Sequence, residues 1–457
     1  MRMSDTEAVM WAVEKDPALR SDFCNLTILE HAPSRSRVRA KVATALEVIP
    51  RLRQRVVSAP LRIVPPEWVD DPDFNLEYHV RSVALPPPGG PREMLDLVGA
   101  LSEAPFDRSR PLWEFTIIEG LADGGAAMLQ KMHHTITDGV GGLKLSLSLV
   151  DFEADPPPDD APVLDVHQEQ AARTSPLDVL RSALVDVTTR NVGAATHAIG
   201  LVGHVATHPQ ELPGRVVDAT RMAASMRRQL LVADGARSDV LVGRSLQRHY
   251  ELFALPLTDV RQTAKHLGGT VNDVFVTGLA GALRRYHLRY DSACDELRMA
   301  MPVSTRERGD SGANRFSPVR VLVPLGPDDS AKRFASIHDR LASVKSEAAL
   351  NAVDMLAGIV STLPTSVLVG VARNQVRTID FTASNLRGSP VPLYMGGARM
   401  TANYPLGPRT GCALNATVLS YCDEMHVGVN IDPAAVEDIP AFMDDLGAAF
   451  DELLALR

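Results

Sequence analysis

Strand-like and helix-like segments alternate along this chain on both sides of one proline-rich break, and this alternation limits the fold more than any other feature. The break is DPPPDDAP at 155–162, where consecutive prolines lack backbone donors and favour extended geometry. The chain has 457 residues, which exceeds the usual size of one domain. We therefore expect a mixed α/β (α+β) fold with an N-terminal domain over 1–155, a Pro-rich and helical linker over 156–248, and a C-terminal domain over 249–457.

The hydrophobic pattern also predicts individual elements. Before the break, alternation of apolar and polar residues predicts a strand at 113–118, and residues 126–132 are expected to form another short strand. After the break, a helical pattern extends over about 175–244, and Thr258 is expected to cap a short helix. Thr270 or Asn272 is expected to start a longer helix that runs to residue 286. The remaining expectations are strands at 251–257, 297–303, 320–325, 414–421 and 425–431, and a closing helix at 440–456.

Charge and cysteine content exclude several classes of protein. The net charge is −9 and the pI is about 5.8, whereas a nucleic-acid-binding protein normally presents a basic face. The four cysteines, at 24, 294, 412 and 422, have no CxxC spacing and indicate free thiols in a reducing compartment. No signal peptide or membrane-spanning helix is expected. A cytoplasmic location follows, and the mildly apolar segment 194–208 is expected to be a solvent-edge helix, with a membrane-associated surface helix as the alternative.

The clearest candidate for chemistry is HHTITDG at 133–139, which directly follows the strand predicted at 126–132. Rigid scaffolds commonly present catalytic groups at such a position. Within the segment, His134 is followed by Asp138 and Gly139, and a glycine allows the tight turn that presents a side chain. The segment is therefore predicted to carry the active site.

The four-residue spacing alone is weak evidence, because the chain contains it twice. His287 and Asp291 repeat the His-x-x-x-Asp pattern near the end of a predicted helix. This second copy lacks the doubled histidine and the following glycine. We assign it no role.

An imidazole at this position suits general-base catalysis. With an ordinary pKa of about 6.5, His134 can accept the proton of a hydroxyl group as that group attacks a substrate. Asp138 would hold the loop or orient the ring. The structural alternative is that both histidines are only hydrogen-bonded loop residues. Metal binding is disfavoured, because adjacent side chains in a strand point to opposite faces and no third ligand cluster is evident.

The motif resembles the HHxxxDG motif of the coenzyme A-dependent acyltransferase superfamily. The blocks around it are similar to those of the bacterial wax ester synthase/diacylglycerol acyltransferase family and follow the family order over essentially the whole chain. The matching blocks are FDRSRPLWE at 106–114, TVNDV at 270–274, MPVS at 301–304, Tyr394 with GGAR at 396–399, and LNATVLSY at 414–421.

The resemblance implies two domains, each like chloramphenicol acetyltransferase, with an active-site tunnel at their interface. Acyl-CoA and the acceptor alcohol would reach the site from opposite sides of this tunnel. In these terms His134 is the base, His133 and Asp138 shape the motif, and Gly139 permits its turn.

The resemblance also implies more distant site residues. Asn272 and Asp273 belong to a motif that faces the site from the second domain. Asn272 would donate a hydrogen bond near the developing oxyanion, or it would cap the following helix, and the sequence favours neither reading. Trp113 is a core residue more often than a substrate contact. Glu14 falls where the family has an N-terminal glutamate close to the site.

Two segments depart from the family pattern. The family commonly has Ser-Asn-Val-Pro-Gly-Pro where this chain has Ser384 and Asn385 followed by Leu-Arg-Gly-Ser. The loss of both prolines alters loop stiffness, and Arg387 adds a charge near an expected apolar tunnel or a phosphate contact. The segment 21–25, SDFCN, replaces Pro-Met-His-Val-Gly. Both departures affect the expected acyl-chain and acceptor preference.

The resemblance implies an O-acyltransferase that moves a long-chain acyl group from acyl-CoA to diacylglycerol or a fatty alcohol. Acyl-CoA is then a substrate, and no cofactor is expected. Because coenzyme A is anionic and the chain is acidic, its binding requires local Arg, Lys or backbone N–H groups. Apolar substrates favour a peripheral association with a membrane or a lipid droplet. The alternatives are a condensation-type domain that forms amides or esters, and a non-catalytic coat protein of lipid inclusions.

Overall fold

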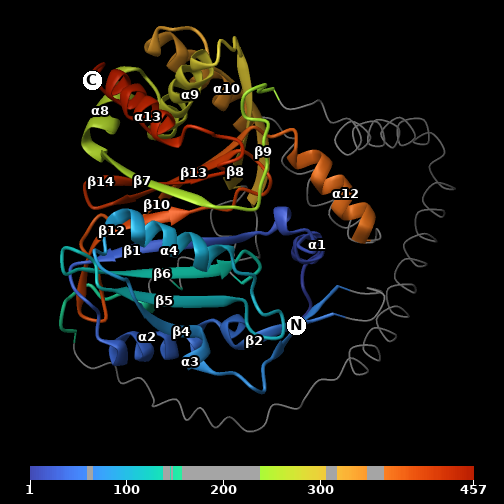
Figure 1. Ribbon diagram of the computed structural model, residues 1–457, viewed down its shortest axis with the longest axis vertical. Coiled ribbons are helices and arrows are strands. Elements are labelled where there is room, and N and C mark those ends of the chain that lie inside the picture. The colour runs from blue at the N-terminus through green and yellow to red at the C-terminus, as the bar shows by residue number, and fades with distance from the viewer. Residues whose placement is uncertain (59–64, 137–144, 146–147, 157–236, 305–315, 347–364) are drawn as a thin grey trace, which may run out of the picture.

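The computed structural model describes residues 1–457 except 59–64, 137–144, 146–147, 157–236, 305–315 and 347–364. The described residues form a mixed α/β fold of two stacked halves, each built on a six-stranded sheet (Figure 1). The strand orders are β11-β12-β1-β6-β5-β4 and β7-β14-β13-β10-β8-β9, and β2 and β3 form a small separate sheet. Among the described residues, no helix combines the length and the apolar character needed to cross a bilayer.

The strands have the following bounds. The first sheet contains β1 (Asp22–Leu29), β4 (Val80–Ala84), β5 (Trp113–Glu119), β6 (Ala126–His133), β11 (Tyr394–Met395) and β12 (Ala398–Leu406). The second contains β7 (His249–Pro256), β8 (Glu296–Ser304), β9 (Phe316–Pro324), β10 (Phe381–Arg387), β13 (Leu414–Tyr421) and β14 (Glu424–Ile431). The small sheet pairs β2 (Gln54–Val57) with β3 (Glu67–Asp70).

The helices have the following bounds. The N-terminal half has α1 (Asp5–Val13), η1 (Pro17–Leu19), α2 (Arg35–Val48), η2 (Pro50–Arg53), α3 (Leu76–His79) and α4 (Pro91–Glu103). The C-terminal half has α8 (Leu257–His266), α9 (Val271–Arg289), α10 (Ser330–Ser346), α12 (Thr365–Val376) and α13 (Ile439–Leu454). Helix α4 packs on the face of the first sheet that is turned toward the second half, where it meets Tyr250 of β7 (Figure 1).

The predicted strands are confirmed, whereas two helix predictions are wrong. Helix α8 begins at Leu257 after Pro256, so Thr258 is not its cap. Helix α9 is capped by Thr270, one of the two predicted starts, and the side chain of Thr270 accepts the N–H of Asp273. Residues 237–244 are not helical, and the earlier part of the expected helical linker lies outside the described residues.

The two halves share backbone as well as side-chain contacts. Strand β12 comes late in the chain, yet it pairs antiparallel with β1 and extends the first sheet. Gly428 of β14 allows β12 to pass close to the second sheet, because a Cβ atom at position 428 would lie 2.2 Å from the carbonyl oxygen of Pro405 in β12. The division of the sequence into 1–155 and 249–457 does not anticipate this exchanged strand.

Candidate active site

The doubled histidine lies at the end of β6, as the sequence predicts. His133 is the last residue of the strand and pairs in register with Asp22 of β1. Its side chain is buried, and its Nε2 lies 2.5 Å from Glu14 Oε1. The N–H of Thr135 donates to Nδ1 at 3.1 Å. Since a backbone N–H can only donate, Nδ1 is the unprotonated nitrogen and Nε2 carries the proton that it donates to Glu14.

This arrangement gives His133 a positioning role. Both ring nitrogens are engaged within the protein, so the ring has no free nitrogen with which to accept a substrate proton. Glu14 is itself fixed, because it forms the C-cap of α1 and accepts the N–H of Ser21 at 2.8 Å. The pair therefore joins the end of α1 to the end of β6 and orients the backbone that leads into His134.

A second buried contact holds the other side of the same loop. Nη1 of Arg51 donates to Glu7 Oε1 at 2.6 Å and to the carbonyl oxygen of Thr135 at 2.7 Å. Glu7 is buried and closes the capping box of α1 with Ser4. Helix α1 thus supports the start of the motif loop through Glu14 and Glu7, two residues on one short helix.

His134 follows β6 and differs from His133 in its surroundings. Its N–H donates to the carbonyl oxygen of Ser21 at 3.3 Å, and its ring lies 4.7 Å from that of Phe23, centroid to centroid. Burial, followed by the neighbouring His133, lowers the pKa of His134 to about 4, although Asp22 and Glu14 act in the opposite direction. The ring is therefore neutral at pH 7, as a general base must be. Asp138 and Gly139 lie outside the described residues.

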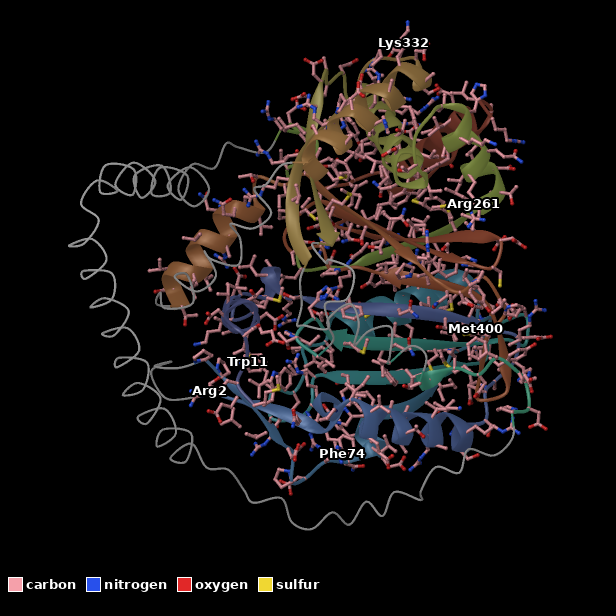
Figure 2. The ribbon with its side chains drawn as sticks, turned by 180° about the vertical axis from the view of Figure 1, so that it is seen from behind. Arg2, Trp11, Phe74, Arg261, Lys332 and Met400 are labelled. Atoms are coloured by element: carbon pink, nitrogen blue, oxygen red, sulfur yellow. The ribbon has the colours of Figure 1, made fainter. Side chains whose placement is uncertain are left out.

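A small cavity lies beside His133. Its volume is about 80 Å³. The residues around it come from α1, β1, the loop before β5 and the end of β6: Trp11, Glu14, Arg20, Asp22, Pro105, Phe106, Arg108, Leu112 and His133. The guanidinium of Arg108 stacks over the ring of Trp11, 3.4 Å from its centroid (Trp11 is labelled in Figure 2). We call this space the His133 cavity.

Asp22 connects this cavity to the second half of the molecule, and the sequence analysis did not identify it. Its carboxylate lies 2.8 Å from Nη1 of Arg248, the residue before β7. Burial alone would raise the pKa of Asp22, but the charge of Arg248, its hydrogen bond to Asp22 and the charge of Lys131 together lower the pKa. The available signal was an acidic residue at the start of an apolar strand, within the segment SDFCN that departs from the family pattern.

Three predicted residues have structural contacts. Asp273 is buried, and its Oδ2 accepts the N–H of Thr270 at 2.8 Å and contacts Nδ1 of His338 at 2.8 Å. The amide nitrogen of Asn272 lies 3.8 Å from the sulfur of Met301. Trp113 is fully buried and donates to the carbonyl oxygen of Leu52, so it packs in the core and does not line the His133 cavity.

Ser384 and Asn385 lie on β10, where they pair in parallel with β13. Ser384 is half-buried, while Asn385 and Arg387 are exposed. In the part of the chain that the structure describes, no group of three or more His, Cys, Asp or Glu residues could hold a metal ion.

Comparisons with known proteins agree with this architecture. Residues 3–275 match the wax ester synthase/diacylglycerol acyltransferase catalytic domain, and residues 312–454 match the WS/DGAT C-terminal domain. The chain is 35% identical to a putative diacylglycerol O-acyltransferase of Mycobacterium tuberculosis, over 100% of this chain and 93% of that protein. It is 32% identical to a second such protein of that organism, over 89% and 86%.

Solved structures show the same fold. The wax ester synthase/diacylglycerol acyltransferase of Marinobacter aquaeolei superposes with a TM-score of 0.65 at 22% identity, covering 99% of this chain and 98% of that one. The first condensation domain of the calcium-dependent antibiotic synthetase superposes with a TM-score of 0.58 at 13% identity, covering 99% and 96%. At these identities the likeness concerns the fold alone. From the domain matches and the relatives at 35% identity, the chain belongs to the wax ester synthase/diacylglycerol acyltransferase family and is an acyltransferase.

Proposed function

We propose that His134 is the general base in the transfer of a long-chain acyl group from acyl-CoA to the hydroxyl group of diacylglycerol or a long-chain alcohol. The observation that carries this proposal is the position and protonation state of His134, which directly follows β6 and whose ring is kept neutral at pH 7 by burial. His133 is held by Glu14 and Thr135 and positions the strand end. The base is therefore assigned to the second histidine.

The reaction needs one proton acceptor and no covalent enzyme intermediate. His134 takes the hydroxyl proton as the alcohol oxygen bonds to the thioester carbon. The tetrahedral intermediate then breaks its carbon–sulfur bond, and the leaving thiolate takes the proton from the imidazolium. The products are the ester and free coenzyme A. Acyl-CoA is a substrate in this scheme, and no resident cofactor takes part.

The test is release of free thiol from a long-chain acyl-CoA in the presence of hexadecanol or dioleoylglycerol. We expect His134→Ala to reduce the rate by roughly two to four orders of magnitude, the range that a general base contributes. The comparison of the two alcohols identifies the preferred acceptor. An amine acceptor in a third reaction tests the condensation-type alternative, and no thiol release with any acceptor would support the non-catalytic alternative.

His287→Ala is the matched control, because His287 belongs to the second His-x-x-x-Asp copy. His287 is buried in α9, with Nδ1 2.7 Å from the carbonyl oxygen of Leu283 and Nε2 2.8 Å from Ser238 Oγ. We expect His287→Ala to lower the stability of the fold and to reduce the rate of thiol release only mildly. Equal loss of activity per folded molecule in the two variants would contradict the role of His134.

We further propose that the protein works at the surface of a membrane or lipid inclusion, because both acceptors are apolar. Sedimentation of the purified protein with lipid droplets made of triacylglycerol and phospholipid tests this location. Recovery of the protein only in the supernatant would contradict it.

A further inference from the structure

A second cavity lies between the two halves, and its lining is unusually rich in arginine. Its volume is about 230 Å³. It is formed by η1, the end of α4, the segment before β7 and the loop between β12 and β13. The lining residues are Pro17, Ala18, Arg20, Glu103, Arg244, Ser245, Leu246, Arg248, Arg409, Thr410 and Gly411. Four arginines thus face one glutamate in a chain whose net charge is −9. We call this space the arginine cavity.

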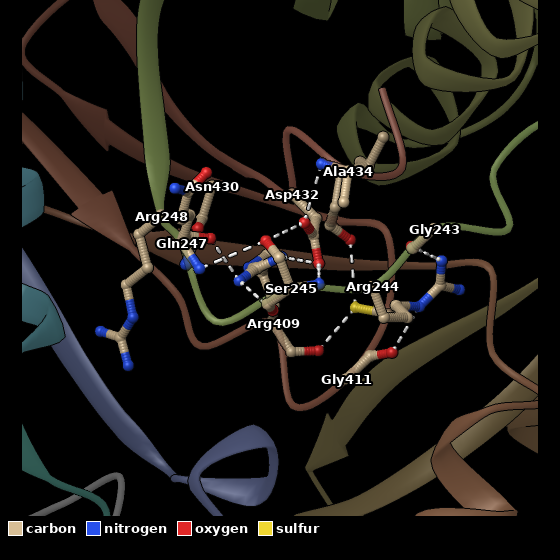
Figure 3. Close-up of polar contacts among 12 residues, drawn as sticks. Gly243, Arg244, Ser245, Gln247, Arg248, Arg409, Gly411, Asn430, Asp432 and Ala434 are labelled. Atoms are coloured by element: carbon tan, nitrogen blue, oxygen red, sulfur yellow. Dashed lines mark hydrogen bonds and ion pairs between the residues drawn. The ribbon is translucent and has the colours of Figure 1, made fainter. Parts of the chain in front are cut away.

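Two of the arginines are oriented by backbone carbonyl groups (Figure 3). Arg244 donates to the carbonyl oxygens of Gly411 at 2.7 Å, Leu241 at 2.6 Å and Gly243 at 2.7 Å. Arg409 donates to the carbonyl oxygen of Gln247 at 2.5 Å and forms an ion pair with the buried Asp432. Carbonyl oxygens fix a guanidinium in place, but they do not neutralise its charge.

The positive charge in this cavity is only partly compensated. Within the described ranges, Arg248 pairs with Asp22 and Arg409 with Asp432, but neither Arg20 nor Arg244 lies within ion-pair distance of a carboxylate. Arg20 donates to the carbonyl oxygen of Glu103 at 3.2 Å. Burial lowers the pKa of Arg244, as expected for a charge removed from water without a full counter-charge. A bound anion would supply that counter-charge.

The arginine cavity adjoins the His133 cavity. Arg20 lines both spaces. Arg248 lines the arginine cavity, and its partner Asp22 lines the His133 cavity, where it lies opposite His133 in the β1–β6 register. A ligand with an anionic end among the arginines could therefore extend toward the end of β6.

We propose that the arginine cavity binds the phosphate groups of the coenzyme A donor. This inference rests on the proposed function, which makes acyl-CoA the donor. Guanidinium groups match phosphate oxygens in geometry and form charge-assisted hydrogen bonds with them. The cavity is smaller than typical pockets of about 300–1,000 Å³, so it holds phosphate groups and leaves the rest of the donor outside it. A phospholipid headgroup has the same chemistry, and the experiment must separate the two sources.

The test measures binding of coenzyme A itself by titration calorimetry, without turnover. The variants are Arg20→Gln and Arg244→Gln, and Arg261→Gln on α8 is the matched control, since Arg261 is exposed and far from the cavity lining (Figure 2). We expect each cavity variant to raise the Kd of coenzyme A at least tenfold, or about 1.4 kcal/mol. Pantetheine, which has no phosphate, should bind the wild type and all three variants with one common, weaker affinity.

Three outcomes would overturn the inference. The first is an unchanged Kd for coenzyme A in a folded Arg20→Gln protein, which remains informative if Arg244→Gln fails to fold. The second is an equal loss in Arg261→Gln, which would indicate a general charge effect. The third is loss of binding to phosphatidic acid vesicles with coenzyme A affinity retained, which would assign the cavity to a lipid headgroup. If coenzyme A binds as expected but no acyl group is transferred, the proposed function fails and the phosphate site stands.

Discussion

The two sheets repeat one pattern of strand pairing, but different side chains follow the equivalent strands β6 and β14. In the first, β1-β6-β5-β4 are joined by two antiparallel pairings and then a parallel one, and β7-β14-β13-β10 repeat the same sequence of pairings in the second. The strand β6 leads into His133 and His134, and its counterpart β14 leads into Ile431 and Asp432. One position in the repeated fold therefore carries an imidazole in one half and a carboxylate in the other.

The carboxylate at this position has a structural role. Asp432 is buried and accepts the N–H of Ser245 at 2.7 Å, the hydroxyl of Ser245 at 2.6 Å and the N–H of Ala434 at 3.1 Å. It also pairs with Arg409. In the first half, by contrast, His133 makes the anchoring contacts with Glu14 and Thr135, and the next residue, His134, is the proposed base. The same strand arrangement thus occurs in both halves, and the role of each strand end depends on the side chain that follows β6 or β14.

Among the changes that test this comparison, Asp432→Ala is expected to have the largest effect on stability. Removal of one partner of a buried ion pair leaves Arg409 uncompensated, so we expect the free energy of unfolding to fall by about 3–5 kcal/mol. His134→Ala should change it by only about 1 kcal/mol, although it removes most of the activity. Urea unfolding of both variants measures the difference.

Asp444→Ala is the control for this experiment, because Asp444 is an exposed carboxylate on α13. It should leave the urea midpoint close to that of the wild type. If Asp432→Ala were as stable as this control yet inactive, Asp432 would have a role in the reaction, and the contrast between the two strand ends would be lost.

A smaller effect is expected when the support of His133 is changed at Glu14. Glu14→Ala leaves the buried Nε2–H of His133 without its acceptor, which costs about 1–3 kcal/mol of stability. The resulting shift of the loop should lower the rate on the order of ten- to a hundredfold. Glu14→Gln retains an oxygen acceptor, so its rate should lie between those of the wild type and the alanine variant. Rates that are equal in the two variants would show that the hydrogen bond does not position the site.

The sequence predicted most of the local structure of both halves. The strand at 113–119 was predictable because apolar and polar residues alternate at its start with a period of two. The strands at 126–133 and 414–421 are short, mostly buried segments that do not alternate, because both of their faces are covered. The position of the doubled histidine at a strand end followed from the short strand predicted at 126–132. The start of α9 was ambiguous because Thr270 and Asn272 are both residue types that cap helices, and only the contact with Asp273 decides for Thr270.

Long-range contacts could not be predicted in this way. No periodicity indicates that β12 leaves its neighbours in the sequence and joins β1 in the first sheet. The pairing of Asp22 with Arg248 depends on the same packing of one half on the other. Glu14 was suggested only by the resemblance to the family, and its bond to His133 required the placement of α1 beside β6. Side chains that meet across the halves therefore required the structure.

The smallest effect, and the sharpest test of how the two strand ends differ, is the pH dependence of the rate. Since the pKa of His134 is lowered to about 4, the ring stays neutral as the pH falls from 7.5 to 5.5. An exposed histidine base with an ordinary pKa of about 6.5 would lose roughly tenfold in rate by pH 5.5, because only about a tenth of it remains unprotonated. We expect kcat/KM for acyl-CoA to change by less than twofold over this range, an order-of-magnitude bound from the same titration.

Stability must be followed in the same samples by circular dichroism. Buried His79 also has its pKa lowered to about 4, mainly by burial, so it takes up a proton more readily in the unfolded chain than in the folded one. Its contribution to stability is present above pH 6.5 and is lost as the pH falls toward 4. A rate that falls with a midpoint near 6.5 while the protein remains folded would mean that the ring of His134 is hydrated like an exposed histidine. The burial that distinguishes the end of β6 would then not govern the protonation of the base.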